Sequence, residues 1–169
     1  CERFLKAFDM GFAAIEFTEG KWMEEKDGAR RIREKAAERG LDVAAFCVGA
    51  DFINGCGGDT KAEIERVKKL VDLAAEMGAF RMRHDISRGF SGTKICRGYD
   101  DSLKITAPAV REIAAYAEQK GIGTMTENHG YFSQDAARVE KLINTVAHPN
   151  FGALVDLGNF MCADEDPTL

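Results

Sequence analysis

Basic charge, paired cysteines and long hydrophobic runs are all scarce in this 169-residue chain. Its net charge of −5 and its pI of about 5.3 argue against a general nucleic-acid binder, because such proteins usually present a basic face. No apolar run approaches the roughly 20 residues that cross a bilayer. No charged-then-apolar leader opens the chain either. We therefore expect neither a nucleic acid nor a membrane as a partner.

Cysteine usage disfavours two further classes of protein. The five cysteines are odd in number and none belongs to a C-x-x-C pair, so a disulfide framework or a structural zinc site is not expected. Reduced thiols are typical of a cytoplasmic protein, which is the location that we predict. The cysteines are Cys1, Cys47, Cys56, Cys96 and Cys162.

The most regular feature of the sequence is a repeated unit, in which an amphipathic helix ends at a glycine and a short apolar strand follows. Glycine just past a helix adopts the left-handed conformation at low steric cost. The predicted strands cover residues 12–17, 41–48, 79–84, 122–127 and 151–156. The helix stops before them are Gly11, Gly40, Gly78, Gly121 and the segment His148-Pro149-Asn150.

Alternating helices and strands predict a parallel sheet with crossover helices, either a doubly wound sheet or a (β/α)8 barrel. No G-x-G-x-x-G motif follows a strand, and the glycine-rich segment 55–58 lacks the ending of a P-loop, which disfavours a nucleotide-binding sheet. Polar residues gather where strands end, as they do in barrel active sites. We predict an α/β fold, an incomplete (β/α)8 TIM barrel, in a single domain over residues 1–169 that is cut at both ends.

Two carboxylates stand at matching positions on successive predicted strands. Glu127 shares a strand face with Gly123 and Met125, and Asp156 ends the next apolar strand. Burying a carboxylate on such a face is costly unless it is paired or binds a metal. A divalent cation would relieve the repulsion between the two and use both as oxygen ligands. Each carboxylate has an alternative, which is to cap the next helix or to pair with an arginine.

Four other residues are candidates for substrate contact, each with a structural alternative. His129 follows Glu127 and is suited to proton exchange near neutral pH, or it is a loop histidine bonded to backbone. His84 ends a strand, or it is a satisfied core histidine. Asn159 lies three residues after Asp156, on a loop or structural turn. Glu16 points opposite to its apolar neighbours, as a substrate contact at the barrel centre or as a structural pair.

The segments 126–130 (Thr-Glu-Asn-His-Gly) and 155–159 (Val-Asp-Leu-Gly-Asn) resemble the xylose-isomerase-like TIM-barrel superfamily of sugar phosphate isomerases and epimerases. The glycine-ended units fall into step with the same family, so the resemblance covers nearly the whole chain. It aligns the chain with strands two to six of eight. A full barrel has about 250 residues, and strands one, seven and eight have no counterpart here.

The resemblance implies a metal-dependent enzyme with Glu127 and Asp156 as two of four ligands, the others being a histidine and a glutamate on the missing strands. The metal polarises a sugar carbonyl, and Glu127, both ligand and base, removes the neighbouring proton. The second base would be the missing glutamate. Manganese is the first choice of metal, with zinc, cobalt and magnesium behind it. Many members carry histidine where this chain has Asn159, which leaves the substrate open.

The expected function is therefore isomerisation or epimerisation of a sugar or sugar-like hydroxy-carbonyl compound, in carbohydrate metabolism. Three alternatives stay open: an inosose-type dehydratase, an abasic-site endonuclease, and an incomplete barrel without catalysis. The endonuclease is disfavoured by the acidic balance and by a total of only three histidines. Whether the protein is a homo-oligomer is left open.

Missing barrel strands would expose two parallel sheet edges and an apolar interior. We therefore expect the isolated 169 residues to be inactive, and poorly stable or prone to aggregate. Sedimentation and thermal melting test this expectation. A monomer with a sharp cooperative melt would contradict it.

Overall fold

Five parallel strands form one sheet in this computed structural model, which describes residues 2–92, 97–130 and 132–168. The strand order is β1-β2-β3-β4-β5, so each strand pairs with its neighbour in sequence. The strands are β1 (Ala14–Thr18), β2 (Asp42–Val48), β3 (Arg81–His84), β4 (Gly123–Glu127) and β5 (Phe151–Leu154). The bounds differ from the predicted ones by one or two residues, and the parallel α/β arrangement is confirmed as a partial barrel.

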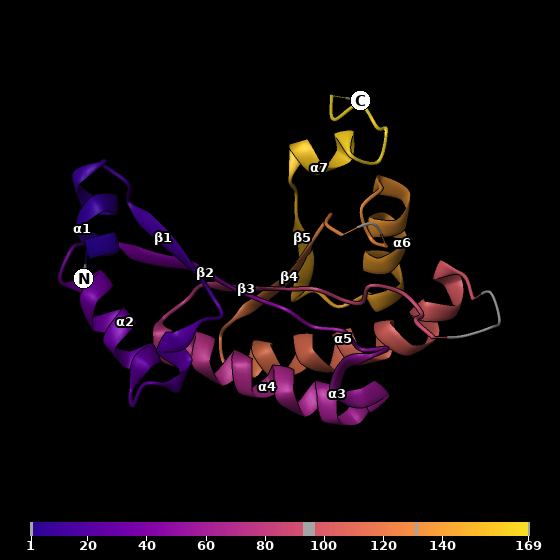
Figure 1. The fold of residues 1–169 in the computed structure, drawn as a ribbon, viewed down its shortest axis with the longest axis horizontal. Coiled ribbons are helices and arrows are strands. Elements are labelled where there is room, and N and C mark those ends of the chain that lie inside the picture. The colour runs from indigo at the N-terminus through magenta and orange to yellow at the C-terminus, as the bar shows by residue number, and fades with distance from the viewer. Residues whose placement is uncertain (1, 93–96, 131, 169) are drawn as a thin grey trace.

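A helix connects each strand to the next. The connecting helices are α2 (Gly28–Ala37), α4 (Thr60–Met77), α5 (Tyr99–Gln119) and α6 (Ala136–Val146). Shorter or terminal helical segments are α1 (Glu2–Asp9), η1 (Lys21–Glu24), α3 (Gly55–Gly58) and α7 (Leu157–Met161). Figure 1 shows α4 and α5 side by side along one face of the sheet, with α2 at one end and α6 at the other.

The predicted helix stops are confirmed. Gly11, Gly40, Gly78 and Gly121 all have positive φ angles, between +64° and +80°. At the fifth stop, Ala147 adopts the left-handed conformation with φ of 46°, one residue before His148. Alanine does not favour this conformation as glycine does. We attribute the end of the helix to Pro149, because proline has no backbone N–H with which to continue it.

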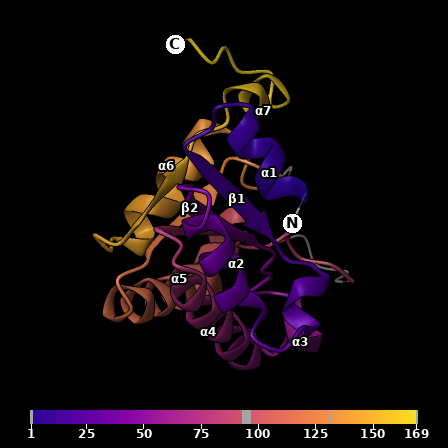
Figure 2. The same ribbon diagram turned by 90° about the vertical axis from the view of Figure 1, so that its left-hand side faces the viewer.

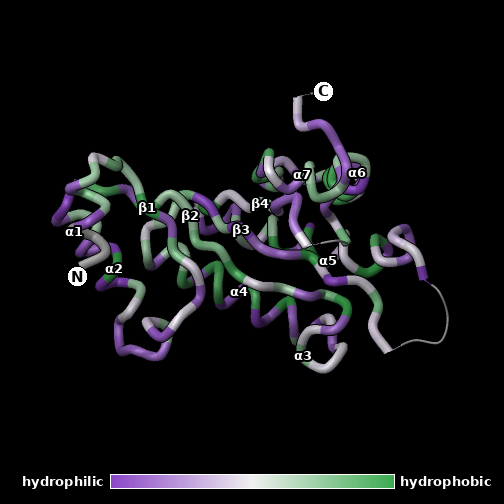
Figure 3. The backbone as a smooth tube through the Cα atoms, turned by 45° about the horizontal axis from the view of Figure 1, so that its top comes forward, coloured by the Kyte–Doolittle hydropathy of each residue, from purple (hydrophilic) through white to green (hydrophobic). Residues whose placement is uncertain are grey.

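The core lies between the sheet and its connecting helices. Phe46, Met82, Val67 and Ile113 are fully buried there, the first two on strands and the last two on α4 and α5. Figure 3 shows hydrophobic positions recurring along these helices, and Figure 2 shows the helices stacked below the sheet when it is seen from its β1 end. This apolar layer holds the strands in one register.

The opposite face of the sheet, which we call the concave face, has a different composition. Cys47, Arg83, Met125 and Gly152 stand in register across β2 to β5, and strand alternation places all four on this face. Met125 and Gly152 are only partly buried. Glu127 shares this face, and its side chain is largely but not fully covered there.

Two further expectations bear on cysteines and membranes. Cys47, Cys56 and Cys162 are free thiols, as predicted, whereas Cys1 and Cys96 lie outside the described residues. In the part of the chain that the structure describes, no helix combines the length and apolarity needed to cross a membrane.

The start of α2 offers a test of how closely this helix packs against η1. A Cβ added at Gly28 would lie 2.0 Å from the carbonyl oxygen of Trp22, a backbone atom that cannot swing aside. Gly28→Ala should therefore lower the free energy of unfolding by about 1–3 kcal/mol, as overpacking does. Urea unfolding measures this change. Gly152→Ala is the control, because its added Cβ would meet nothing within 4 Å, and equal stability of both variants would refute the packing argument.

Candidate active site

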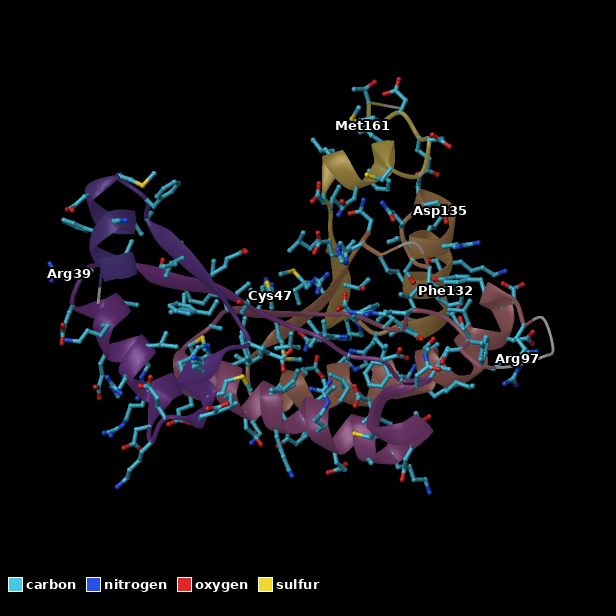
Figure 4. The ribbon with its side chains drawn as sticks, in the orientation of Figure 1. Arg39, Cys47, Arg97, Phe132, Asp135 and Met161 are labelled. Atoms are coloured by element: carbon cyan, nitrogen blue, oxygen red, sulfur yellow. The ribbon has the colours of Figure 1, made fainter. Side chains whose placement is uncertain are left out.

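Polar side chains collect on the concave face at the C-terminal ends of β3, β4 and β5. In a parallel barrel this end of the strands carries the active site. Cys47 marks the middle of the sheet in Figure 4, and Asp135 and Phe132 mark the segment between β4 and α6.

Glu127, the last residue of β4, is held from two sides. Its Oε2 accepts a hydrogen bond of 2.9 Å from Nε of Arg83, and Nη2 of Arg83 lies 2.9 Å from the same oxygen as an ion pair. Its Oε1 accepts a hydrogen bond of 3.1 Å from Nδ2 of Asn159. The carboxylate is therefore fixed in orientation, and its side chain remains 19% exposed on the concave face.

Arg83 is the cation at the centre of the site. Its side chain is 10% exposed, and its Nη2 lies 2.9 Å from Oδ1 of Asp85 as well as from Glu127. One guanidinium thus joins the ends of β3 and β4, using the fork geometry that suits arginine to two carboxylates. Arg83 was not among the site residues predicted from the sequence. The signal was its position two residues before Asp85 on the face that carries Glu127.

Asp156 lies just beyond β5 and caps α7. Its Oδ1 accepts hydrogen bonds from the backbone N–H groups of Gly158 at 2.8 Å and Asn159 at 3.3 Å. The backbone N–H and carbonyl of Asp156 are both hydrogen-bonded to the side chain of Asn128, which is buried. Both alternatives weighed from the sequence thus occur, since Asp156 caps a helix and Glu127 pairs with an arginine. The capping bonds use only Oδ1 of Asp156.

Asn159 joins the two carboxylates. Its backbone N–H contacts Asp156 and its side-chain amide contacts Glu127. A histidine at this position would not present the same short amide donor. Asn159 is therefore in the site, where the sequence placed it, but its observed contact is with Glu127.

His129 and Glu16 lie at the margin of the site. His129 is 54% exposed, with its Nδ1 3.9 Å from Oδ1 of Asp85. Glu16 is exposed and pairs in register with Ala45 of β2. Ala45 lies two residues before Cys47 on β2, so strand alternation places Glu16 on the concave face as well. Both positions are open to a ligand, and the substrate contacts predicted for them stay predictions.

His84 lies in the core instead. Its ring is fully buried on the helix side of β3, stacked on Phe151 and edge-on to Phe52. Its Nδ1 lies 3.0 Å from the carbonyl oxygen of Asp85. Its Nε2 has no hydrogen-bond partner among the described residues. This position argues against the substrate contact predicted from the sequence. The reason is strand alternation, because a residue next to Arg83 must face the other way.

A small cavity of about 50 Å³ opens beside Glu127. It lies between the C-terminal ends of β3 and β4, under the loop that begins at His129. Its lining is mixed: Ile86 and Gly130 stand beside the polar residues Asp85, Ser87, Arg88, Thr126, Glu127, His129 and Ser133. The volume suits a few water molecules or a single polar group rather than a whole sugar.

The surroundings of Cys47 favour its thiol form. Burial raises the pKa of Cys47, and the charges of Glu16, Glu127 and Asp85 raise it further, against the opposing effect of Arg83. A raised pKa disfavours the thiolate, which is the nucleophilic form of cysteine.

A divalent metal was predicted at Glu127 and Asp156. Glu127 pairs in register with Leu154, and Asp156 lies two residues beyond on the same strand path, so both carboxylates come from adjacent strand ends. Their oxygens are the donors that hard divalent ions prefer. The two residues thus fit as part of a ligand set. Among the described residues, no group of three or more histidine, cysteine or acidic side chains could hold a metal alone.

The family of the chain follows from a comparison with protein-family models. Residues 4–169 match the model described as xylose isomerase-like TIM barrel. The chain belongs to this family. No curated protein matches it significantly in sequence.

Solved structures of similar fold include several enzymes. A D-psicose 3-epimerase in the presence of D-fructose has a TM-score of 0.80 and 16% identity, over 98% of this chain and 60% of that one. The probable 3-DHS dehydratase AsbF from Bacillus anthracis has a TM-score of 0.79 and 18% identity, again over 98% and 60%. An IolI protein with a bound zinc atom has a TM-score of 0.74 and 16% identity, over 94% and 58%.

At these identities the likeness establishes the fold. The chain spans about 60% of the length of the first two structures and 58% of the third. The five strands seen here therefore correspond to part of a barrel of eight.

The buried His84 should make stability depend on pH. Burial lowers the pKa of His84 from its usual 6.5, so the folded state disfavours the protonated ring. The stability is intact above pH 6.5 and is lost as the pH falls from there toward the folded-state pKa, because only the unfolded chain then binds the proton. Over the first unit below 6.5 the loss is about 1 kcal/mol.

His84→Phe should remove this contribution, since phenylalanine fits between Phe52 and Phe151 without a titrating nitrogen. Urea unfolding at pH 7.5 and pH 5.5 gives the measurement, with the loss of stability smaller in the variant by about 1 kcal/mol. Identical losses in both proteins would show that His84 does not titrate on unfolding.

Proposed function

We propose that this protein is a metal-dependent isomerase or epimerase of a sugar or a sugar-like hydroxy-carbonyl compound. The observation that carries the proposal is the placement of Glu127 and Asp156 at the C-terminal ends of adjacent strands, in a chain of the xylose isomerase-like family. A bound divalent ion would polarise the substrate carbonyl. Manganese suits the two carboxylate ligands, and zinc, cobalt and magnesium are alternatives.

Glu127 is the proposed base. Its carboxylate lies on the open concave face, where Arg83 and Asn159 hold it in one orientation. It would accept a proton from the carbon next to the substrate carbonyl, leaving the negative charge on the carbonyl oxygen. Return of the proton to the opposite face of that carbon inverts its configuration, and return to the neighbouring carbon moves the carbonyl.

Substrate contacts are proposed for the exposed polar groups around Glu127. His129 can donate or accept a hydrogen bond to a hydroxyl group, and Glu16 can accept one, since both are open to solvent on this side of the sheet. The side-chain nitrogen of Asn159 donates to Glu127, and its side-chain oxygen Oδ1 accepts no hydrogen bond from the described residues. Uncharged polyhydroxy compounds match this set of short polar groups.

The structural neighbours support the substrate class. An epimerase that was solved with D-fructose and the zinc-bound IolI share the fold. The dehydratase also shares it. Proton removal next to a carbonyl can begin an epimerisation, an isomerisation or a dehydration. A screen of substrates by NMR separates these reactions.

Metal content is the first test. The full-length protein should contain about one divalent ion per chain by elemental analysis, and the double variant Glu127→Gln/Asp156→Asn should lose it, because the carboxylate charges bind the ion. The matched control is Asp72→Asn/Glu112→Gln. It makes the same chemical changes on the outer surfaces of α4 and α5, where the carboxylates pair with lysines.

Loss of the ion in the site variant alone justifies a screen of ketoses and cyclic hydroxyketones by NMR in deuterium oxide. Exchange of a carbon-bound proton identifies isomerisation or epimerisation, and loss of water identifies a dehydratase. Equal metal, or none, in all three proteins would refute the proposal and leave Glu127 and Asp156 as structural residues.

A further inference from the structure

We infer that Asn128 is a positioning residue that sets the separation of Glu127 and Asp156. It follows Glu127 in the chain, but strand alternation directs its side chain away from the concave face. It would therefore act on the metal site through backbone rather than by contact. This inference rests on the proposed function, because it concerns the same pair of carboxylates.

The pairing of β4 with β5 ends before the site is complete. The last residues in register are Glu127 and Leu154, and Asp156 lies two residues further along. Between them Val155 is 58% exposed. Regular sheet pairing therefore does not fix the backbone of Asp156.

The side chain of Asn128 continues the ladder at this point. Its Nδ2 donates to the carbonyl oxygen of Asp156 at 2.8 Å, and its Oδ1 accepts from the backbone N–H of Asp156 at 2.7 Å. One amide thus takes both backbone groups of a residue on the neighbouring strand path, as a peptide unit would. Aspartate would offer acceptors only, and serine would be too short to reach both groups.

Burial makes this pair of bonds hard to replace. Asn128 is 1% exposed, so water cannot readily take the place of the amide. Removing it would leave the N–H and the carbonyl of Asp156 without these partners, which costs more than an exposed hydrogen bond would. Asp156 would then shift together with α7, the helix that it caps.

These hydrogen bonds form a closed network around the site. Asn128 holds the backbone of Asp156, Asp156 caps the turn that contains Asn159, and the Asn159 amide returns to Glu127 at 3.1 Å. The separation of the two carboxylates is thus fixed at two places. Of these, the Asn128 contact is the more deeply buried.

The test measures Mn²⁺ binding to the full-length protein by isothermal titration calorimetry. Asn128→Ala should weaken binding by about 10- to 100-fold, the range found when residues behind metal ligands are removed. Asn128→Ser should also weaken it, and its hydroxyl keeps the buried position polar. The serine variant decides the result if the alanine variant fails to fold.

Asn150→Ala is the matched control. The Asn150 side chain also donates to two backbone carbonyls, those of Ala114 at 3.0 Å and Ile122 at 2.8 Å, at the opposite end of β4 and β5. Its loss should lower the urea midpoint, as in the Asn128 variants, but leave the affinity for Mn²⁺ within twofold of the wild type.

The outcomes separate the two proposals. If the wild type binds none of Mn²⁺, Zn²⁺, Co²⁺ and Mg²⁺, each titrated in the same way, the proposed function fails and the role of Asn128 fails with it. If the wild type binds and both Asn128 variants bind equally well, only the positioning role is overturned. An equal loss of affinity in Asn150→Ala would also overturn it, because the effect would then be a general consequence of lower stability.

Discussion

The apolar layer between the sheet and its connecting helices is the constraint on which the rest of the structure depends. Phe46 of β2 and Met82 of β3 are buried against α4 and α5, and their burial fixes which face of each strand turns inward. Because side chains alternate along a strand, the intervening residues must face the concave side. Arg83 and Glu127 reach the site in this way, and His84 is excluded from it.

Arg83 is the cation that joins the carboxylates at the ends of β3 and β4, with its Nη2 2.9 Å from both Asp85 and Glu127. Arg81, two residues earlier on β3, shares the concave face and lies beside Gly123. Burial is the largest cause of the raised pKa of Cys47, and the carboxylates of Glu16, Glu127 and Asp85 raise it further against the effect of Arg83. A face with surplus carboxylate charge favours cations. This is consistent with a divalent ion as the proposed partner of Glu127 and Asp156.

Membership of the xylose isomerase-like family establishes the fold, whereas the side chains of the site decide the activity. The family match covers nearly the whole chain and establishes the fold. The fold alone does not select an activity, because function depends on particular side chains. Here those are the contacts of Glu127 with Arg83 and Asn159, and the hold of Asn128 on Asp156. They provide an oriented carboxylate beside a second one.

The sequence by itself determined the order of helices and strands, because hydrophobic periodicity and the glycine stops at Gly78 and Gly121 are local signals. It also placed Glu127 and Asp156 at neighbouring strand ends. Only the tertiary structure decided which partners these side chains take. Arg83 lies 44 residues before Glu127, and Asn128 lies 28 residues before Asp156. Such contacts depend on the register between strands, which the folded sheet sets and no local pattern encodes.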